Sequence, residues 1–251
     1  MDARQVSRTF RLGNDLIHAV RGVSLEVWPG EFIAIVGRSG SGKTTLLNLM
    51  AGLDRPTSGQ VFFDGKDLSA MGEREIVNLR RWRLGFVFQS FALLPLLSAY
   101  ENVELPLRIA GVGAAERAEQ ARAALEMVGL ARRAGHRPFE LSGGEQQRVA
   151  IARAAVMQPA VILADEPTGE LDSANAAAIF NLFREMVDRD GMSILATTHD
   201  RTLLDLADCV YDLHDGVLAL RLDRRGEAGD ERFKRPADRG GPARETGWKK
   251  R

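Results

Sequence analysis

Short apolar runs without polar alternation recur along the chain and predict buried β-strands. They cover residues 31–36, 61–63, 84–88, 160–164 and 193–198. Runs of this length are typical of strands that are covered on both faces, as in a parallel sheet. Segments with helical character separate them, and this alternation predicts an α/β fold with a mainly parallel sheet.

Three segments have helical character: 44–53, 114–128 and 142–157. In the second, apolar residues recur at spacings of three and four, and Gly129 ends a pattern formed by Ala118, Ala121, Leu125 and Val128. The two later helices lie between about residues 91 and 158, where the strand-like runs are interrupted. We therefore expect a helical subdomain inserted into the sheet at this point.

The composition changes at the C-terminal end. Residues 223–251 are rich in Arg, Gly, Asp, Glu and Pro, and their ten Lys/Arg against six Asp/Glu give a net charge of +4. Such a sequence buries too little apolar surface to fold, so we expect a folded domain over 1–222 and a disordered tail over 223–251. We favour a solvated extension, with contact to anionic lipid or to a partner as the alternative.

The remaining bulk properties are those of a globular protein. The 251 residues are 45% hydrophobic and 27% charged, with a formal net charge of zero, so no nucleic-acid partner is expected. A single cysteine, Cys209, excludes an intrachain disulfide. Residues 1–22 lack the apolar core of a signal peptide, and no run of about 18 apolar residues suggests a membrane span.

A glycine-rich loop follows the first apolar run. It fits the phosphate-binding pattern G-x-x-x-x-G-K-[ST] and comprises Gly37, Arg38, Ser39, Gly40, Ser41, Gly42, Lys43 and Thr44. Glycines let backbone N–H groups converge on phosphate oxygens, and the following helix adds a favourable dipole. Lys43 is suited to the β- and γ-phosphates of a nucleoside triphosphate, and the Thr44 hydroxyl is suited to Mg²⁺.

A pair of carboxylates, Asp165 and Glu166, follows the apolar run 160–164. The carboxyl ends of parallel strands meet at one edge of a sheet. Asp165 is therefore expected beside the glycine loop, where it would hold Mg²⁺ and its waters. Glu166 is suited to polarise an attacking water.

A second glycine-containing segment, Leu141 to Gln146, opens the last predicted helix. Ser142 with Glu145 three residues later forms a capping box. A capped helix start that contains Gly143 and Gly144 is also an anion site, because only small residues let a phosphate approach the backbone. The two interpretations are compatible.

The order of these elements resembles the ATP-binding subunit of an ABC transporter. In chain order the elements are the glycine loop, Gln89 after a strand, Leu141 to Gln146, Asp165 to Thr168, Leu171-Asp172 and His199, and the similarity covers about residues 4–220. It implies a P-loop NTPase core (RecA-like) with a mainly parallel sheet, an antiparallel β portion and an inserted helical subdomain. It also implies ATP and Mg²⁺ as cofactors.

The resemblance implies roles for single residues. Gln89 would contact Mg²⁺ and the attacking water, and His199 would hydrogen-bond the γ-phosphate, so that both act with Glu166 in catalysis. Thr45 would belong to the ATP-binding loop. Phe10 is the candidate for stacking on adenine, with a core or strand role as the alternative.

The resemblance also implies a head-to-tail homodimer with ATP sandwiched between subunits. In it the ATP site of one subunit would be completed by the other subunit's Ser142, Gly143, Gly144 and Glu145. Asp172 would belong to the loop that couples the two sites.

Two further segments, Gln89 to Pro95 and Glu101 to Leu107, resemble the lipoprotein-releasing and macrolide-export branch of the family, with cell-division relatives nearby. This implies a separately encoded permease, a place at the cytoplasmic face of the membrane, and export. Glu170 departs from the branch, where asparagine is expected. One alternative is mechanical signalling through a permease-like partner that transports nothing. The other, a soluble ABC ATPase of DNA repair or translation, is disfavoured because the chain shows one cassette, no long heptads and no cysteine cluster.

Overall fold

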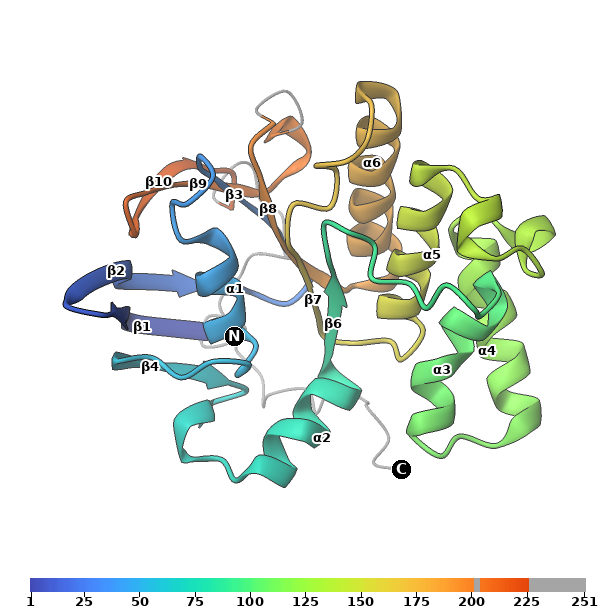
Figure 1. Ribbon diagram of the computed structural model, residues 1–251, viewed down its shortest axis with the longest axis horizontal. Coiled ribbons are helices and arrows are strands. Elements are labelled where there is room, and N and C mark those ends of the chain that lie inside the picture. The colour runs from blue at the N-terminus through green and yellow to red at the C-terminus, as the bar shows by residue number, and fades with distance from the viewer. Residues whose placement is uncertain (201–203, 226–251) are drawn as a thin grey trace.

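The computed structural model describes residues 1–200 and 204–225, and their strands form two sheets (Figure 1). The core sheet has the order β10-β9-β3-β8-β7-β6 and consists of β3 (Phe32–Val36), β6 (Leu84–Val87), β7 (Val161–Ala164), β8 (Ser193–Thr198), β9 (Cys209–His214) and β10 (Val217–Asp223). The antiparallel sheet has the order β2-β1-β4-β5 and consists of β1 (Asp2–Leu12), β2 (Asp15–Glu26), β4 (Ser58–Phe63) and β5 (Lys66–Asp67).

The core sheet is parallel from β9 to β6, and β10 pairs antiparallel with β9. Its central strands β3, β8 and β7 are buried on both faces. In β3, Phe32, Ala34 and Val36 point into one apolar cluster, while Ile33 and Ile35 point into the other. An unbroken apolar run is what a strand between two cores requires, so the predicted α/β fold with a mainly parallel sheet is confirmed.

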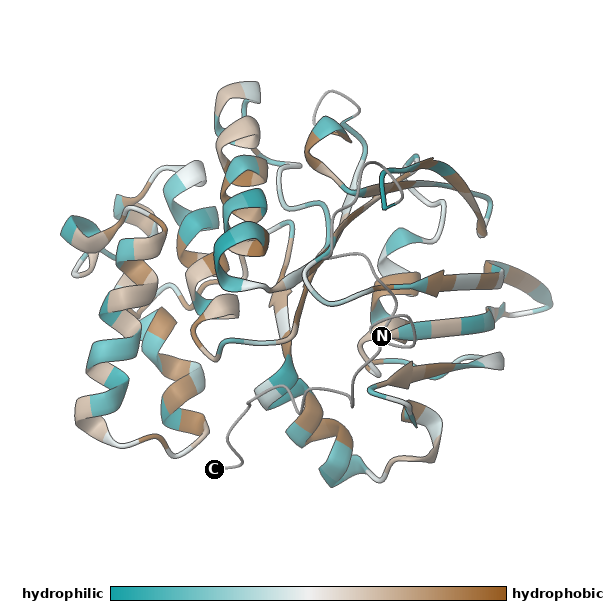
Figure 2. Cartoon of the chain, turned by 180° about the vertical axis from the view of Figure 1, so that it is seen from behind, coloured by the Kyte–Doolittle hydropathy of each residue, from teal (hydrophilic) through white to brown (hydrophobic). Residues whose placement is uncertain are grey.

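Helices cover both faces of the core sheet (Figure 1). One face carries α1 (Lys43–Met50) together with the antiparallel sheet. The other face carries α6 (Ser173–Asp190) and the helices between β6 and β7, which are α3 (Ala99–Ile109), α4 (Ala114–Met127) and α5 (Gly143–Ala155). A further helix, α2 (Glu73–Arg83), leads into β6. Figure 2 shows hydrophobic residues gathered in the central strands and mixed polar and apolar bands on the surrounding helices.

The predicted helices match α1, α4 and α5, with ends that differ by at most three residues. Capping explains where the helices begin. The Ser142 hydroxyl accepts from Glu145 N at 3.3 Å, and the Asp172 carboxylate accepts from Asn175 N at 2.8 Å, so α5 and α6 start directly after these side chains. No helix among the described residues is long and apolar enough to cross a membrane.

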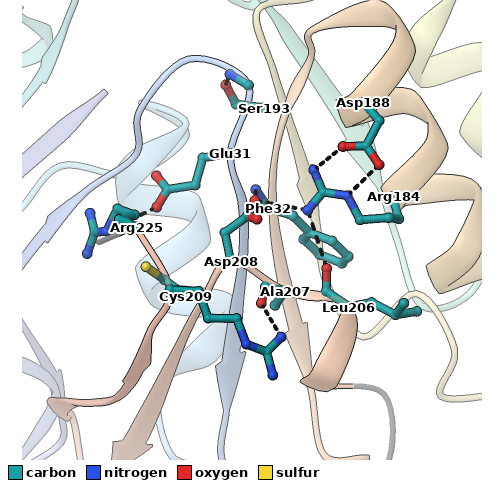
Figure 3. Close-up of polar contacts among 12 residues, drawn as sticks. Glu31, Phe32, Arg184, Asp188, Ser193, Leu206, Ala207, Asp208, Cys209 and Arg225 are labelled. Carbon is teal, nitrogen blue, oxygen red and sulfur yellow. Dashed lines mark hydrogen bonds and ion pairs between the residues drawn. The ribbon is translucent and has the colours of Figure 1, made fainter. Parts of the chain in front are cut away.

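A polar cluster lies at the amino edge of the core sheet, where β3 and β9 begin (Figure 3). Arg184 of α6 pairs with Asp188 at 2.8 Å and with Asp208 at 3.0 Å, and the Asp208 carboxylate also accepts from Phe32 N at 2.8 Å. These contacts join α6 to β3 and β9.

The second part of this cluster holds Arg225, which follows β10, against the core sheet. Arg225 pairs with the buried Glu31 at 3.4 Å and with Asp223 at 3.0 Å. The boundary expected after residue 222 therefore falls too early, because β10 ends at Asp223 and Arg225 is bound to the body. Residues 226–251 of the expected tail lie outside the described residues.

Candidate active site

The glycine loop connects β3 to α1, and it lies between the two sheets. Gly42 has a φ of 103°, and a Cβ atom there would collide with the Ala19 carbonyl oxygen of β2. A Cβ atom at Gly37 would lie 2.5 Å from the Leu213 carbonyl oxygen of β9. Both positions therefore require glycine. The other side of the loop, at Arg38, Ser39 and Gly40, faces solvent.

Lys43 places a positive charge at the centre of this loop. Its side chain is only 4% exposed and pairs with the Glu166 carboxylate at 2.9 Å. Its ammonium also donates to the carbonyl oxygens of Gly37 at 2.8 Å and Arg38 at 3.0 Å. The ammonium is thus held between the loop and the acid that follows β7.

Asp165 is bound by hydroxyl groups from two directions. Thr44 donates to one carboxylate oxygen at 2.6 Å, and Thr197 donates to the other at 2.8 Å. Thr197 is fully buried in β8 and also accepts from Glu166 N at 2.9 Å. Sequence reasoning missed Thr197, although a polar residue inside a buried strand was the available signal.

The oxygen atoms of Thr44 and Asp165 suit a hard cation such as Mg²⁺, which prefers oxygen ligands and takes a few of them from protein. Thr44 is exposed, so its hydroxyl is accessible from the loop side. Among the described residues, no group of three or more His, Cys, Asp or Glu side chains is placed to hold a metal ion. A cation bound here would therefore complete its coordination with phosphate and water oxygens.

Glu166 has a strained backbone and an ionised side chain. Its φ of 43° lies in the left-handed region, which is uncommon for a residue with a side chain. Burial opposes ionisation, but the hydrogen bond and charge of Lys43, with a further contribution from His199, outweigh it and lower the pKa of Glu166. The carboxylate is therefore charged at neutral pH and able to accept a proton.

His199 and Gln89 lie at the same edge of the sheet. The His199 ring is 61% exposed, and its Nδ1 lies 3.2 Å from the second carboxylate oxygen of Glu166. Gln89 follows β6, and its amide nitrogen lies 3.0 Å from the position of a Cβ atom at Gly169. Gly169 N in turn donates to the Glu166 carbonyl at 3.0 Å. The structure thus gathers the three predicted catalytic residues around one loop.

The segment Ser142 to Glu145 lies elsewhere. The α5 helix that it opens packs in one core cluster and α1 in the other, on opposite faces of the core sheet. No hydrogen bond or ion pair between the described residues joins segment 142–145 to segment 37–45. A Cβ atom at Gly144 would collide with Asn175, whose side chain donates to Asp172 at 3.0 Å. Asn175, which sequence reasoning also missed, therefore packs the start of α6 against the start of α5.

Two predicted positions, and the divergent Glu170, stay outside these contacts. Thr45, in the first turn of α1, is half-buried. Phe10 on β1 is 38% exposed, and the Arg8 guanidinium lies 4.5 Å from its ring centroid. Its stacking on adenine remains a prediction. Glu170 is exposed between Gly169 and Leu171.

The fold and this set of residues define an ATP-binding cassette. A family model described as "ABC transporter" matches residues 20–169, and the chain belongs to this family. An ABC transporter ATP-binding protein of Thermotoga maritima is 47% identical over 226 residues, which are 90% of this chain and 96% of the relative.

Longer relatives match over only part of their length. The macrolide export ATP-binding/permease protein MacB of Syntrophobacter fumaroxidans is 44% identical over 87% of this chain but only 31% of the relative, so this chain spans about a third of it. The ATP-binding cassette MJ0796 of Methanocaldococcus jannaschii has a solved structure, described as a dimeric post-hydrolysis state bound to ADP and Pi. It superposes with a TM-score of 0.82 at 41% identity, covering 90% of this chain and 99% of that one. The chain is an ATP-binding, ATP-hydrolysing subunit of the ABC transporter type.

Proposed function

We propose that the chain works as a head-to-tail pair that binds ATP between the glycine loop of one copy and the Ser142 segment of the other. The observation that carries this proposal is the separation of the two segments on opposite faces of the core sheet. Each segment is an anion site by its own geometry, and neither completes the other within one chain. The dimeric state of the similar cassette MJ0796 supports the pairing.

In this arrangement the described residues divide the chemistry among them. Lys43 and the loop N–H groups bind the phosphates, and Glu166 takes a proton from the attacking water. His199 and Gln89 orient the γ-phosphate and that water. The Thr44 hydroxyl, and Asp165 through water, would hold Mg²⁺, which would supply neutralisation of the phosphate charge.

We also propose that ATP hydrolysis by this chain drives a separately encoded permease. The chain would bind that permease at the cytoplasmic face of a membrane, and transport would be in the direction of export. Support comes from MacB, whose name joins ATP-binding and permease functions and of which this chain spans a third. A groove of about 510 Å³ between α2, β6, α3 and α5 suits such a partner. Exposed apolar side chains line it beside arginines, among them Val77, Phe88, Ile109, Arg80 and Arg153. This lining fits an amphipathic segment that carries acidic residues.

The pairing is tested with a hydrolysis-deficient background. Glu166→Gln protein with ATP should run as a dimer in size-exclusion chromatography with light scattering. Adding Ser142→Arg should leave ATP binding to each monomer intact and abolish the dimer, because the bulky cation lies across the interface.

Ser98→Arg in the same background is the matched control. Ser98 caps α3 with the same capping box, formed with Glu101, so its replacement costs a similar helix cap. That variant should still form the dimer. A dimer that persists with Ser142→Arg removes the proposed sandwich.

A further inference from the structure

The turn that follows Gln89 has an unusual backbone. Phe91 and Ala92 have φ angles of 57° and 49°, so two successive residues with side chains adopt left-handed conformations. Ala92 N donates to the Ser90 carbonyl within this turn. Such conformations cost energy and persist only where surrounding contacts hold them.

Arg153 of α5 supplies those contacts. Its guanidinium donates to the Ala92 carbonyl at 2.7 Å and to the Phe91 carbonyl at 3.0 Å. Within the ranges 1–200 and 204–225, no carboxylate lies at ion-pair distance from it. Burial lowers the pKa of this guanidinium. A planar fork that reaches two carbonyls at once is a geometry that arginine provides and lysine does not.

The α5 helix follows β6 and the turn along much of its length. Near its end, a Cβ atom at Gly85 of β6 would lie 2.6 Å from the Ala154 carbonyl oxygen, so strand and helix backbones are in close contact. Near its start, the Phe91 ring lies 3.7 Å from the position of a Cβ atom at Gly143. One helix therefore touches the strand before Gln89 and the turn after it, and it also carries the Ser142 cap.

We propose that Arg153 is a positioning residue for Gln89. By holding the Phe91–Ala92 turn in its left-handed form, it fixes the Gln89 amide beside Gly169 and links that position to α5. This inference rests on the proposed role of Gln89 in hydrolysis. Arg153 acts through the backbone of this turn, to which its guanidinium donates.

Steady-state ATP hydrolysis by the 251-residue chain tests the link between Arg153 and Gln89. Arg153→Gln should lower kcat by about tenfold to a hundredfold, the range expected when a catalytic group shifts by up to about 1 Å, and leave KM for ATP nearly unchanged. Gln89→Ala should lower kcat by at least as much. The double variant should be no slower than Gln89→Ala, because both changes remove the same contribution.

Ala92→Gly distinguishes positioning from mere packing of α5. Glycine adopts the left-handed conformation without strain, so adding Ala92→Gly to Arg153→Gln should restore kcat several-fold. A packing defect would not respond to this change. Arg153→Lys, which keeps the charge but loses the fork, should fall between wild type and Arg153→Gln, and it serves as the test variant should Arg153→Gln not fold. Arg122→Gln, an exposed arginine of α4, is the control and should match wild type.

The results separate two kinds of failure. Wild-type turnover in Gln89→Ala would remove the assigned role of Gln89, and this inference with it. Loss of turnover in Gln89→Ala together with normal kcat in both Arg153→Gln and Arg153→Lys would overturn the inference alone. Two further results would overturn the inference. One is a kcat of the Arg153→Gln/Gln89→Ala double variant that lies below that of Gln89→Ala by the full factor seen for Arg153→Gln alone. The other is an unchanged kcat when Ala92→Gly is added to Arg153→Gln.

Discussion

Ionic side chains gather at both edges of the core sheet and bind backbone groups at each, but the two groups differ in what surrounds them. At the amino edge, Arg184 and Asp208 bind each other and also backbone groups: Arg184 donates to the Leu206 carbonyl, and Asp208 accepts from Phe32 N. At the carboxyl edge, Lys43 and Glu166 pair beside an exposed loop and an exposed histidine.

The difference separates structural from catalytic use of charge. The amino-edge pair satisfies backbone groups and joins α6 to β3 and β9, so its loss leaves buried polar groups without partners. The carboxyl-edge pair holds a base and a cation ready for a ligand. Substitutions at the amino edge should therefore change stability, and substitutions at the carboxyl edge should change turnover.

The largest effect is expected for Glu166→Gln. An amide of the same size keeps the packing but accepts no proton, so turnover should fall by about 10²- to 10⁴-fold, the usual contribution of a general base. ATP binding should persist, as measured by equilibrium titration with a fluorescent ATP analogue. Hydrolysis at the wild-type rate would show that Glu166 is not the base.

Asp208→Asn tests the opposite edge. Removing the charge of Asp208 should lower the free energy of unfolding by about 2 kcal/mol, because Arg184 keeps Asp188 as a partner but loses its charged hydrogen bond to Asp208. Urea unfolding measures the loss. Turnover per folded molecule, assayed well below the unfolding transition, should equal that of wild type.

Arg189→Gln is the control for this prediction. Arg189 lies on the same helix, is 77% exposed and pairs with Glu185 at 3.8 Å. An exposed pair contributes at most about 1 kcal/mol, so this change should be nearly silent. Equal destabilisation by Asp208→Asn and Arg189→Gln would contradict the structural role of the amino edge. So would a loss of turnover that occurs in Asp208→Asn and not in Arg189→Gln.

The same comparison shows what the sequence could predict. The carboxyl edge was predictable because each residue there follows an apolar run, and parallel strands bring their carboxyl ends together. Glu166 and Lys43 were therefore placed near each other from patterns more than a hundred residues apart. The Arg184–Asp208 pair joins two segments with no motif, so nothing in the sequence indicated it.

The long strands β1 and β2 were not predicted for a different reason. Gln5 has a φ of 50°, and the pairing register shifts between Ala3 and Val6. Ala3 and Val6 both face the core although they are three residues apart, which breaks the two-residue alternation that marks a strand. The Arg153 fork was missed because its partners are backbone carbonyls, which the sequence does not show. Thr197 was missed because its partners, the Asp165 carboxylate and Glu166 N, follow a different strand.

The smallest predicted effect is a difference in pH dependence between the edges. Burial raises the pKa of Glu31 despite its hydrogen bond from Trp28 N and the nearby Arg225. The contribution of Glu31 to stability is therefore present below the pKa of a glutamate in the unfolded chain, near 4.5. It is lost as the pH rises through the pKa of Glu31 in the folded protein. Relative to wild type, Glu31→Gln should gain stability as the pH rises from about 4.5 to 8 in urea unfolding.

Glu166 should show the opposite sign. Its pKa is lowered, because Lys43 and His199 outweigh burial, so its contribution is present above 4.5 and is lost as the pH falls through the folded pKa. Relative to wild type, Glu166→Gln should gain stability only below about pH 4.5. The two glutamates share no partner, so the double variant should show both trends added. The opposite signs follow because burial at the amino edge disfavours the charge of Glu31, whereas Lys43 and His199 at the carboxyl edge stabilise the charge of Glu166. Trends of the same sign would contradict this difference between the two edges.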